Sequence, residues 1–492
     1  MDFLDPKKQK AHDRRLALGY VLIALLLLLS TTVLLYQAYG FGIDRSGHVI
    51  QNGLVFLSSQ PQGADIYVNK EKKTQTNDRL VLPAGAYTVE LKKDGYRDWK
   101  RPITIDGGSV GRFDYPFLVP TTLATTTTKQ YTATPSFLTQ SRDRHWLVTQ
   151  GSSLDRFDVF NINVNASKTT VPVQSLDVPS DIYTASTTTK GWTVVEWSDD
   201  NRHVTLKRDF DKDSQSGSEY ILFDRQDPTQ SQNLTELFGV NPTNLAMRDK
   251  KFDQYYLYDQ NAQQLLTATV KKPTPQPLVS DVVAYTNNGD MLLYATTNGA
   301  QNGKLAVKLR QDTKTYDVRQ ITAHSTPLLE LASYGNTWFA AVGAQSENKV
   351  YVYKDPVGQL LKDSSHVPVP AQILKVDAPS FVSFSKNGRF AMAQNATQVA
   401  VYDEETDKGY VWQFKLPIDT PQTHISWMDG FRMTYVTAGK VAIMDFDGTN
   451  SQVLSAANPA YLPMFNPNYN YLFTLTTQNA ISNTPLMTPA DL

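Results

Sequence analysis

The chain of 492 residues contains no cysteine. Disulfides, thiolate nucleophiles, iron–sulfur clusters and cysteine-ligated zinc sites are therefore excluded. The sequence also lacks an excess of charge of either sign, because 47 Lys and Arg stand against 48 Asp and Glu. Nucleic-acid binding usually requires a clearly basic domain, so this balance predicts no nucleic-acid partner.

Motifs that carry chemistry are missing as well. The seven histidines show no H-x-H or H-E-x-x-H spacing, and no EF-hand loop is present. Neither a Gly-Lys-Ser/Thr phosphate loop nor a G-x-S-x-G elbow occurs. We therefore expect that the protein is not an enzyme and that it binds no cofactor or metal ion. His145 and His203 follow similar polar turns, which favours a structural role for both.

Charged residues make up only 19% of the chain, whereas tyrosine alone numbers 25. Aromatic residues are enriched in strands, so this composition favours sheets over charged helices. At roughly 150 residues per domain, the length suggests about three units.

One long apolar run stands near the N-terminus. No residue between Arg15 and Asp44 is charged, and the run Leu16–Tyr36 contains six successive Ala and Leu residues from Ala24 to Leu29. A helix needs about 20 apolar residues to cross a bilayer. The sequence predicts a transmembrane helix over residues 16–39, after a cytoplasmic basic tail of residues 1–15.

The charges around this run predict its orientation. Five basic residues precede the run, whereas the only charged residues that follow it closely are Asp44 and Arg45. These topology-determining residues are Lys7, Lys8, Lys10, Arg14 and Arg15. The positive-inside rule keeps such a flank in the cytoplasm and exports the rest, so the C-terminal domains are expected at the cell surface or in the periplasm. Tyr36 and Tyr39 suit the outer interface of the bilayer.

A cleaved signal peptide is the alternative to this membrane anchor. The apolar region is longer than the usual 7–15 residues of a signal peptide. Its end, Leu35 to Gly40, lacks a small-x-small cleavage site. We therefore favour an uncleaved signal anchor, whose partner is the lipid bilayer.

Three ordered motifs follow a juxtamembrane segment (40–53). The first motif, Ser59 to Asn69, contains a turn that precedes a strand. The second, Leu82 to Val89, contains a turn that precedes a strand of alternating polarity. The third, Lys93 to Tyr96, forms the turn that closes the hairpin. Gly permits positive φ and Pro presets a corner, so each motif residue has a structural role. These residues are Pro61, Gly63, Ala64, Pro83, Gly85, Tyr87, Gly95 and Tyr96.

This set of motifs resembles a PEGA domain over residues 54–119. Gln62 stands where the naming motif has Glu, and Lys70 where a turn Gly is usual. The resemblance implies a small, non-enzymatic β-sandwich on an exported or surface protein, as in a bacterial cell envelope. Tyr96, Trp99 and Tyr115 form either an exposed aromatic strip for contact with a glycan or protein, or the core of the module. Half-buried strands favour the second interpretation.

A threonine-rich segment (120–135) with few core residues is predicted to be a linker. From residue 136 onward an aromatic or apolar residue, a polar turn and an apolar strand recur roughly every 40 to 60 residues. Copies lie at 137–148, 197–206, 248–253 (the weakest), 285–294, 334–341, 384–392, 427–433 and 465–473. Several are followed by a strand that ends in Asp, at Asp224, Asp403 and Asp445. Such an Asp can accept backbone N–H groups of the next turn.

This repeat predicts a β-propeller of seven or eight blades over residues 136–485, followed by a tail (486–492). Phe384 to Phe390 resembles the turns of TolB-like and WD-repeat-like propellers. Separate β-sandwiches in series are the alternative. The fold class is thus an all-β ectodomain after one N-terminal helix.

The leading functional hypothesis is a non-enzymatic, membrane-anchored, extracytoplasmic binding or scaffold protein. The propeller is its expected recognition surface, for a protein or a cell-envelope glycan. An envelope hydrolase or lyase that acts on glycan or peptide in the propeller channel is one alternative. The ectodomain of a transmembrane sensor, which needs a separate signalling partner, is another.

Overall fold

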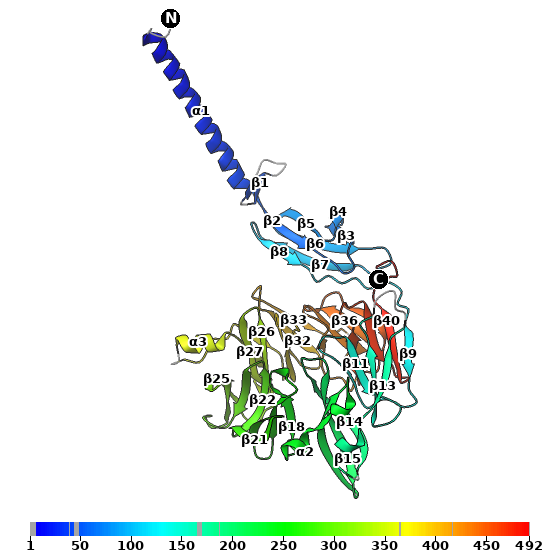
Figure 1. The fold of residues 1–492 in the computed structure, drawn as a ribbon. Helices are drawn as coiled ribbons and strands as arrows, with labels where there is room; N and C mark the ends of the chain where they lie inside the picture. The colour runs from blue at the N-terminus through cyan, green and yellow to red at the C-terminus, as the bar shows by residue number, and fades with distance from the viewer. Residues whose placement is uncertain are drawn as a thin grey trace. The chain divides into compact units, whose positions relative to one another are not determined.

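The computed structural model describes residues 6–38, 40–43, 49–164, 170–185, 187–363, 366–415 and 417–491. The chain divides into two compact units, Met1–Thr121 and Thr122–Leu492. Figure 1 shows one long helix followed by a chain of strands.

Helix α1 (Pro6–Ala38) begins upstream of the predicted start at residue 16. The basic tail therefore extends the same helix, because its Lys, Arg, Gln and Ala residues are good helix formers. The segment His12–Ala38 has a mean hydropathy of 2.5 and is not buried by any other part of the described chain. Helix α1 is thus long and apolar enough to cross a membrane. Tyr39 lies outside the described residues.

The rest of the first unit contains two four-stranded sheets among its described residues. One comprises β1 (Phe41–Ile43), β2 (Val49–Leu57), β5 (Asp78–Pro83) and β8 (Val110–Phe113). The other comprises β4 (Glu71–Gln75), β3 (Asp65–Val68), β6 (Gly85–Lys92) and β7 (Trp99–Ile105). Strand β2 begins inside the predicted juxtamembrane segment, so the module starts before residue 54.

The core of this unit contains the inward-facing residues of both sheets. Val55, Ile66 and Leu91 are almost fully buried. Trp99 is 1% exposed and packs edge-on against Tyr115 at 6.2 Å between ring centroids. Tyr96 is buried as well, so the core interpretation of these three aromatic residues is confirmed and the exposed strip is not.

The described part of the second unit contains eight four-stranded antiparallel sheets, numbered here in chain order. Sheet 1 comprises β10 (Leu138–Gln140), β11 (Trp146–Gln150), β12 (Arg156–Asn161) and β13 (Val173–Asp177), and sheet 2 comprises β14 (Thr188–Trp197), β15 (His203–Lys212), β16 (Gln215–Asp224) and β17 (Gln232–Asn233). Sheet 3 comprises β18 (Asn244–Met247), β19 (Gln254–Asp259), β20 (Gln264–Thr269) and β21 (Lys272–Val279), and sheet 4 comprises β22 (Val282–Asn288), β23 (Met291–Thr296), β24 (Lys304–Gln311) and β25 (Lys314–Thr322).

Sheet 5 comprises β26 (Pro327–Tyr334), β27 (Thr337–Ala344), β28 (Lys349–Lys354) and β29 (Gln372–Lys375), and sheet 6 comprises β30 (Phe381–Phe384), β31 (Phe390–Gln394), β32 (Gln398–Asp403) and β33 (Lys408–Gln413). Sheet 7 comprises β34 (Ser426–Trp427), β35 (Arg432–Thr437), β36 (Lys440–Asp445) and β37 (Gln452–Ala456), and sheet 8 comprises β38 (Met464–Phe465), β39 (Tyr471–Leu475), β40 (Ala480–Pro485) and β9 (Thr126–Gln130). Two short helices, α2 (Leu234–Phe238) and α3 (Pro356–Lys362), lie in connections.

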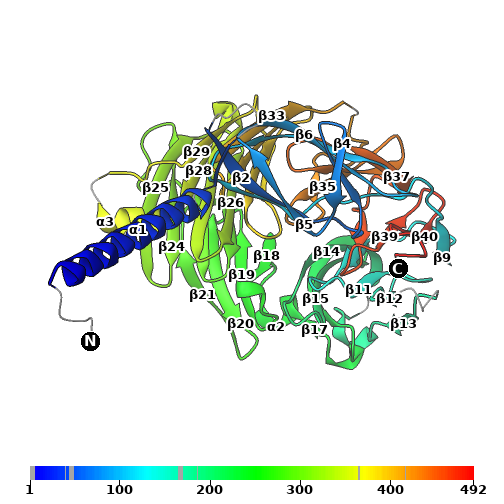
Figure 2. The same cartoon turned by 90° about the horizontal axis from the view of Figure 1, so that it is seen from above.

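Burial follows the position of a strand within its sheet. Second strands such as β23 and β35 are buried at every residue, whereas the outer strand β33 alternates between exposed and half-buried residues. Apolar residues of neighbouring sheets form shared core clusters, including one between sheets 8 and 1. Figure 2 shows the sheets following one another around a ring. This arrangement is a β-propeller, and it contradicts separate sandwiches in series.

Strand β9 lies within the threonine-rich segment that the sequence predicts to be a linker. Ala480 of β40 pairs with Gln130, and Asn483 pairs with Thr126, so β9 completes sheet 8. Threonine is a good strand former, which explains how a segment of low complexity adopts this role. The first strand of the second unit, β9, thus closes the ring by pairing with the last sheet in chain order. Strand β40 ends at Pro485.

Candidate functional site

Each of the eight predicted repeat segments spans the hairpin between the first and second strands of one sheet. These eight hairpins and first strands contact the neighbouring sheets all around the ring. In sheet 6, one of the partners, Glu405, lies in the turn between the third and fourth strands. The contacts are Asp143 N to Asn201 Oδ1 (2.9 Å), Asp199 N to Lys250 O (2.9 Å), Asn287 Nδ2 to Met247 O (3.1 Å), Asn288 Nδ2 to Leu331 O (3.0 Å), Tyr334 Oη to Glu405 Oε2 (2.6 Å), Lys386 N to Asp429 O (3.4 Å), Arg432 against the Tyr469 ring (5.4 Å) and Gln140 Nε2 to Phe465 O (2.8 Å).

The first strands of sheets 1, 2, 7 and 8 surround a cavity of about 520 Å³. Its lining is rich in aromatic and apolar side chains, together with Gln140 and Lys386. The ring-bearing members are Phe137, Trp192, Trp427, Tyr461 and Phe465. None of the described residues that line the cavity is an Asp or a Glu. A concave, mostly apolar site with a few polar groups is typical of a ligand pocket.

Lys386 supplies the positive charge of this cavity. Lys386 is an exposed residue at the edge of the cavity that it lines. Partial desolvation by the surrounding protein, together with the repulsion from Arg144, lowers the pKa of Lys386 to about 8. Asp429 acts in the opposite direction. Lys386 is therefore mainly a cation at neutral pH but close to its titration range.

Arg144 adds a second cation near Lys386. Its guanidinium lies 4.1 Å from the centroid of the Tyr469 ring. Its Nη1 atom is buried and has no hydrogen-bond partner among the described residues. Burial lowers the pKa of Arg144. Arg144 is not among the described residues that line the cavity, so it adds positive potential near Lys386 rather than a contact with a ligand. This potential favours a negatively charged group as ligand.

Two first strands of the ring also carry acidic side chains outside the lining of the cavity. Glu196 of β14 forms an ion pair of 2.6 Å with Lys250. Glu330 of β26 accepts a hydrogen bond from the N–H of Leu331 at 3.1 Å. Burial raises the pKa of Glu330 to about 7, with Lys250 acting in the opposite direction. The polar character of the first strands thus changes from sheet to sheet.

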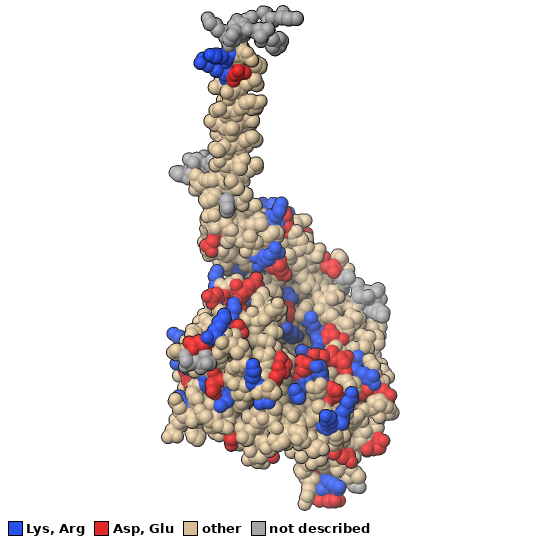
Figure 3. All heavy atoms as spheres, turned by 60° about the vertical axis from the view of Figure 1, so that its left-hand side comes forward, with Lys and Arg blue, Asp and Glu red and all other residues tan. Residues whose placement is uncertain are grey.

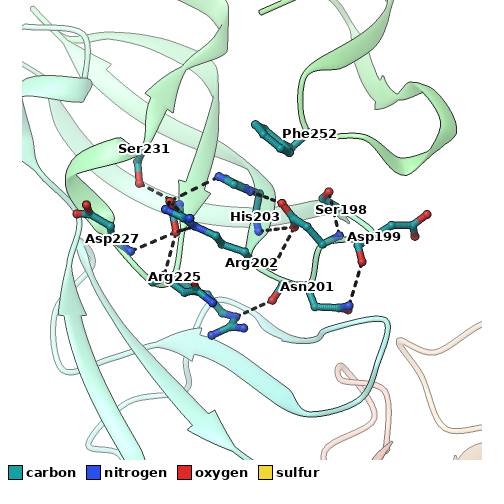
Figure 4. Close-up of polar contacts among 12 residues, drawn as sticks. Ser198, Asp199, Asn201, Arg202, His203, Arg225, Asp227, Ser231 and Phe252 are labelled. Carbon is teal, nitrogen blue, oxygen red and sulfur yellow. Dashed lines mark hydrogen bonds and ion pairs between the residues drawn. The ribbon is translucent and has the colours of Figure 1, made fainter.

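The Asp residues that end the third strands stabilise the turns that follow. Asp224 accepts the N–H groups of Gln226 and Asp227, at 2.9 and 3.2 Å. The Arg202 side chain binds the same carboxylate, and His203 Nε2 lies 3.5 Å from it (Figure 4). In sheet 6, Asp403 accepts the Glu405 N–H at 3.1 Å. The predicted structural role of these aspartates is confirmed at both positions.

Histidine takes part in this turn structure. His203 is 8% exposed, its Nδ1 lies 2.5 Å from Asp200 Oδ2, and its ring stacks on Phe252 at 4.1 Å. Figure 4 shows Phe252 facing His203 from a neighbouring segment. His145 lies 3.2 Å from Asp143. Within the described residues, no group of three or more His, Asp and Glu side chains is placed to bind a metal.

The predicted topology-determining residues belong to helix α1. Lys10, Arg14 and Arg15 are exposed near its N-terminal end, where Figure 3 shows the basic side chains of the helix. Lys7 and Lys8 belong to the same helix, but their side chains lie outside the described part of the structure.

The predicted PEGA motif residues occupy turns and the core of the first unit. Gly63 and Gly95 have φ of +76° and +82°, a backbone region that favours glycine. Ala64 is fully buried, and Pro61 is buried in the turn between β2 and β3. The Tyr87 hydroxyl donates to the carbonyl of Pro83 at 2.9 Å across the hairpin that includes Gly85.

Sequence reasoning did not identify the cavity. Lys386 and Trp427 belong to repeat segments, which predict the fold and not a cavity. Trp192 and Tyr461 lie outside the repeat segments. The sequence carries no signal for the cavity at Lys386, because a Lys in a polar turn such as Ser385-Lys386-Asn387 is ordinary and Lys386 is exposed.

Comparison with known proteins gives one family match. Residues 52–118 match the PEGA domain family. No curated protein matches the chain. The chain is similar to several solved structures at low identity. Hsv2 of Kluyveromyces lactis is 10% identical, with a TM-score of 0.40 over 65% of this chain and 98% of Hsv2.

Two enzymes are among the other structural neighbours. The dihydro-heme d1 dehydrogenase NirN is 12% identical, with a TM-score of 0.39 over 66% of each chain. A prolyl endopeptidase is 10% identical, with a TM-score of 0.36 over 78% of this chain and 55% of the endopeptidase. Scores this low carry no argument about function. The first unit therefore matches a PEGA domain, and the second is a propeller on the evidence of its own strand order.

Proposed function

We propose that the protein is a non-enzymatic binding or scaffold protein of the cell envelope, anchored by α1 and exposing an eight-bladed propeller outside the cytoplasm. The observation that carries this proposal is the cavity among the first strands, with its aromatic lining and Lys386. Aromatic rings bind apolar or sugar rings by stacking, while a cation fixes an acidic group. The PEGA match and the apolar helix fit the same role.

The expected ligand class is a glycan that carries carboxylates. Trp427 and Tyr461 line the cavity with aromatic rings, and Lys386 lines it with a positive charge, to which Arg144 adds from nearby. A neutral glycan would not provide a counter-charge for Lys386, and the described lining of the cavity contains no Asp or Glu that does so. Acidic oligosaccharides should therefore bind better than neutral ones of equal length.

Calorimetric titration of the full chain in lipid nanodiscs tests this proposal. The probes are hyaluronan oligosaccharides, which carry carboxylates, and chitin oligosaccharides of the same length, which do not. Lys386→Met should weaken binding of the acidic probe about tenfold or more, because it removes a charge-assisted contact. Lys408→Met is the matched control, since Lys408 is exposed on the outer strand β33. Equal binding of both probes, or equal effects of both substitutions, would contradict the proposal.

The non-enzymatic part of the proposal needs its own measurement. Glu196 and Glu330 are the carboxylates on first strands that could serve as acid and base in a hydrolase. The full chain should leave hyaluronan oligosaccharides intact over long incubation, as measured by mass spectrometry. Product formation that disappears in Glu330→Gln would establish the hydrolase alternative instead.

Topology is tested by labelling, because the chain has no cysteine of its own. Gln9→Cys near the N-terminus and Val411→Cys on β33 each create one reactive thiol. A membrane-impermeant maleimide should label the second variant in intact bacterial cells, and the first only after permeabilisation. The reverse pattern would overturn the proposed orientation. A mature chain that starts near Gly40 would exclude the anchor.

A further inference from the structure

One face of the sheet β1–β2–β5–β8 is apolar where a soluble module would be polar. Leu54 of β2 pairs with Val81 of β5 on one side and with Val110 of β8 on the other. Paired residues of adjacent strands point to the same face, so the three side chains form one row. Val81 is 63% exposed and Val110 is 59% exposed, whereas the next residue of β2, Val55, is buried.

The next row on the same face has a different composition. Phe56 pairs with Arg79 on β5 and with Arg112 on β8. The Arg112 guanidinium lies 4.6 Å from the centroid of the Phe56 ring. Both arginines are exposed. The row therefore consists of an aromatic ring between two cations.

Further along the strands the face becomes polar. Ser58 follows Phe56 on the same side, and its hydroxyl donates to Asp114 at 3.3 Å. The face thus changes along β2 from apolar, through aromatic and basic, to polar and acidic. Membrane interfaces show the same order, with hydrocarbon first, then a zone where aromatic and basic residues meet the headgroups, then water.

The apolar row is the one nearest to helix α1. The N–H of Asn52, two residues before Leu54, donates to the carbonyl of Gly40 at 2.7 Å. Near this end of the helix, Tyr36 stacks on Phe41 of β1 at 4.7 Å. A groove of about 650 Å³ is lined both by Gln37 and Gly40 and by Leu54, Val81 and Val110. The face is therefore continuous with the C-terminal end of α1.

We propose that this face, defined by Leu54, Phe56, Arg79, Val81, Val110 and Arg112, binds the outer surface of the lipid bilayer. The proposal rests on the proposed anchor, because α1 brings the face to the membrane. The apolar row enters the boundary between headgroups and acyl chains, and Phe56 lies at headgroup level. Arg79 and Arg112 bind lipid phosphates, as arginine does bidentately. The bilayer then determines the orientation of the PEGA module.

Fluorescence quenching in liposomes tests this proposal on the full chain. The absence of cysteine allows single-site labelling with the environment-sensitive dye NBD. Labels are placed through Val81→Cys, Val110→Cys, Leu27→Cys in the middle of α1, and Val411→Cys on the propeller. Val411 is the matched control, because its exposed fraction of 64% is nearly the same as the 63% of Val81. The liposomes contain phosphatidylcholine with or without 30% phosphatidylglycerol, and part of the lipid is brominated at a known depth.

The expected pattern distinguishes the docking face from the anchor. Lipids brominated deep in the acyl chain should quench the label at position 27, and lipids brominated near the headgroup should quench the labels at 81 and 110. The label at 411 should remain unquenched. Quenching at 27 without quenching at 81 and 110 overturns the docking face and leaves the anchor intact. No quenching at 27 overturns the anchor and the docking face together.

Two further variants test the chemistry of the face. Val81→Glu should reduce quenching of the label at 110 to the level at 411, because a carboxylate opposes insertion of the apolar row. Arg79→Gln with Arg112→Gln should remove the extra quenching that phosphatidylglycerol produces. Labels at 81 and 110 that are shielded from iodide in water but not quenched by brominated lipid would indicate a protein partner or a second copy of the chain, and would contradict lipid binding.

Discussion

The Tyr131 hydroxyl donates a hydrogen bond of 2.7 Å to the carboxylate of Asp158 and so joins the end of β9 to β12. Strand β9 belongs to sheet 8 and β12 to sheet 1, so this contact lies where the ring closes. Lys129 adds an ion pair of 2.6 Å to the same carboxylate, and Ser175 a hydrogen bond of 2.5 Å. Asp158 is 1% exposed. One buried acceptor therefore receives three side-chain contacts at the point where the ring closes.

Asp158→Ala should destabilise the propeller by roughly 3 kcal/mol, because it leaves a lysine and two hydroxyl donors without their acceptor. Urea denaturation of the full chain measures the loss. Burial raises the pKa of Tyr131, so its hydroxyl remains a donor at any working pH and the loss should not depend on pH between 6 and 9.

Asp177→Ala is the matched control on the neighbouring strand β13. Asp177 pairs with Arg156 at 3.5 Å and is 74% exposed, so its removal should cost less than about 1 kcal/mol. Similar losses in both variants would show that the ring does not depend on the closure contact.

The sequence predicted the eight hairpins of the propeller because each one is local. A turn such as Ser385 to Gly388 and the apolar strand after it lie within ten residues, and the hydrogen bond from Ser385 N to Phe390 O forms within that span. Strand β9 was not predictable in the same way. Its partner β40 lies at the other end of the chain, and a run of threonines fits a linker as well as an outer strand.

The cavity could not be predicted for a related reason. Lys386 belongs to sheet 6, but Arg144, which lowers its pKa, belongs to the first hairpin of the ring. Only the closed ring brings these cations together. In the first unit, the sequence predicts a strand at Leu54 to Leu57, but it does not predict the parallel pairing of β2 with β8 that places Val110 beside Leu54.

Arg389 and Asp403 form an ion pair with two contacts in sheet 6, at 2.8 Å from Nε and 2.7 Å from Nη2. Arg389→Ala should cost roughly 3 kcal/mol of unfolding free energy, because the Asp403 carboxylate is buried and would lose its counter-charge. Arg142→Ala is the control, because the side chains of Arg142 and its partner Asp199 are 50% and 58% exposed. This substitution should lower the unfolding free energy by less than about 1 kcal/mol. Thermal unfolding of the two variants side by side makes the comparison.

Binding of acidic oligosaccharides should depend on pH through Lys386. Its pKa is lowered to about 8, so the free protein loses this positive charge as the pH rises from 7 to 9. The affinity for hyaluronan oligosaccharides should fall across that range, and calorimetry at constant ionic strength measures it. Lys386→Arg should keep the charge and flatten the dependence, because arginine does not titrate below pH 12. A steep dependence that persists in Lys386→Arg would assign it to another group.

Glu404 should make the propeller less stable as the pH rises. It is 5% exposed, and neither carboxylate oxygen has a hydrogen-bond partner among the described residues. Burial raises its pKa to about 9, with Asp403 and Asp407 acting in the same direction and Lys354 in the opposite one. The folded state therefore keeps a proton that the unfolded chain releases above pH 4.5, and the free energy of unfolding decreases from about pH 4.5 to 9.

Glu404→Gln removes this titration, because the amide carries no charge at any pH. The variant should be more stable than the unsubstituted chain at pH 8 by roughly 3 kcal/mol and similar to it at pH 4.5. Urea denaturation at half-unit steps of pH measures both curves. Glu236→Gln, at an exposed position in α2, should leave the curve unchanged. If Glu404→Gln has the same pH dependence as the unsubstituted chain, Glu404 is ionised in the folded state and a cation must lie within reach of its carboxylate.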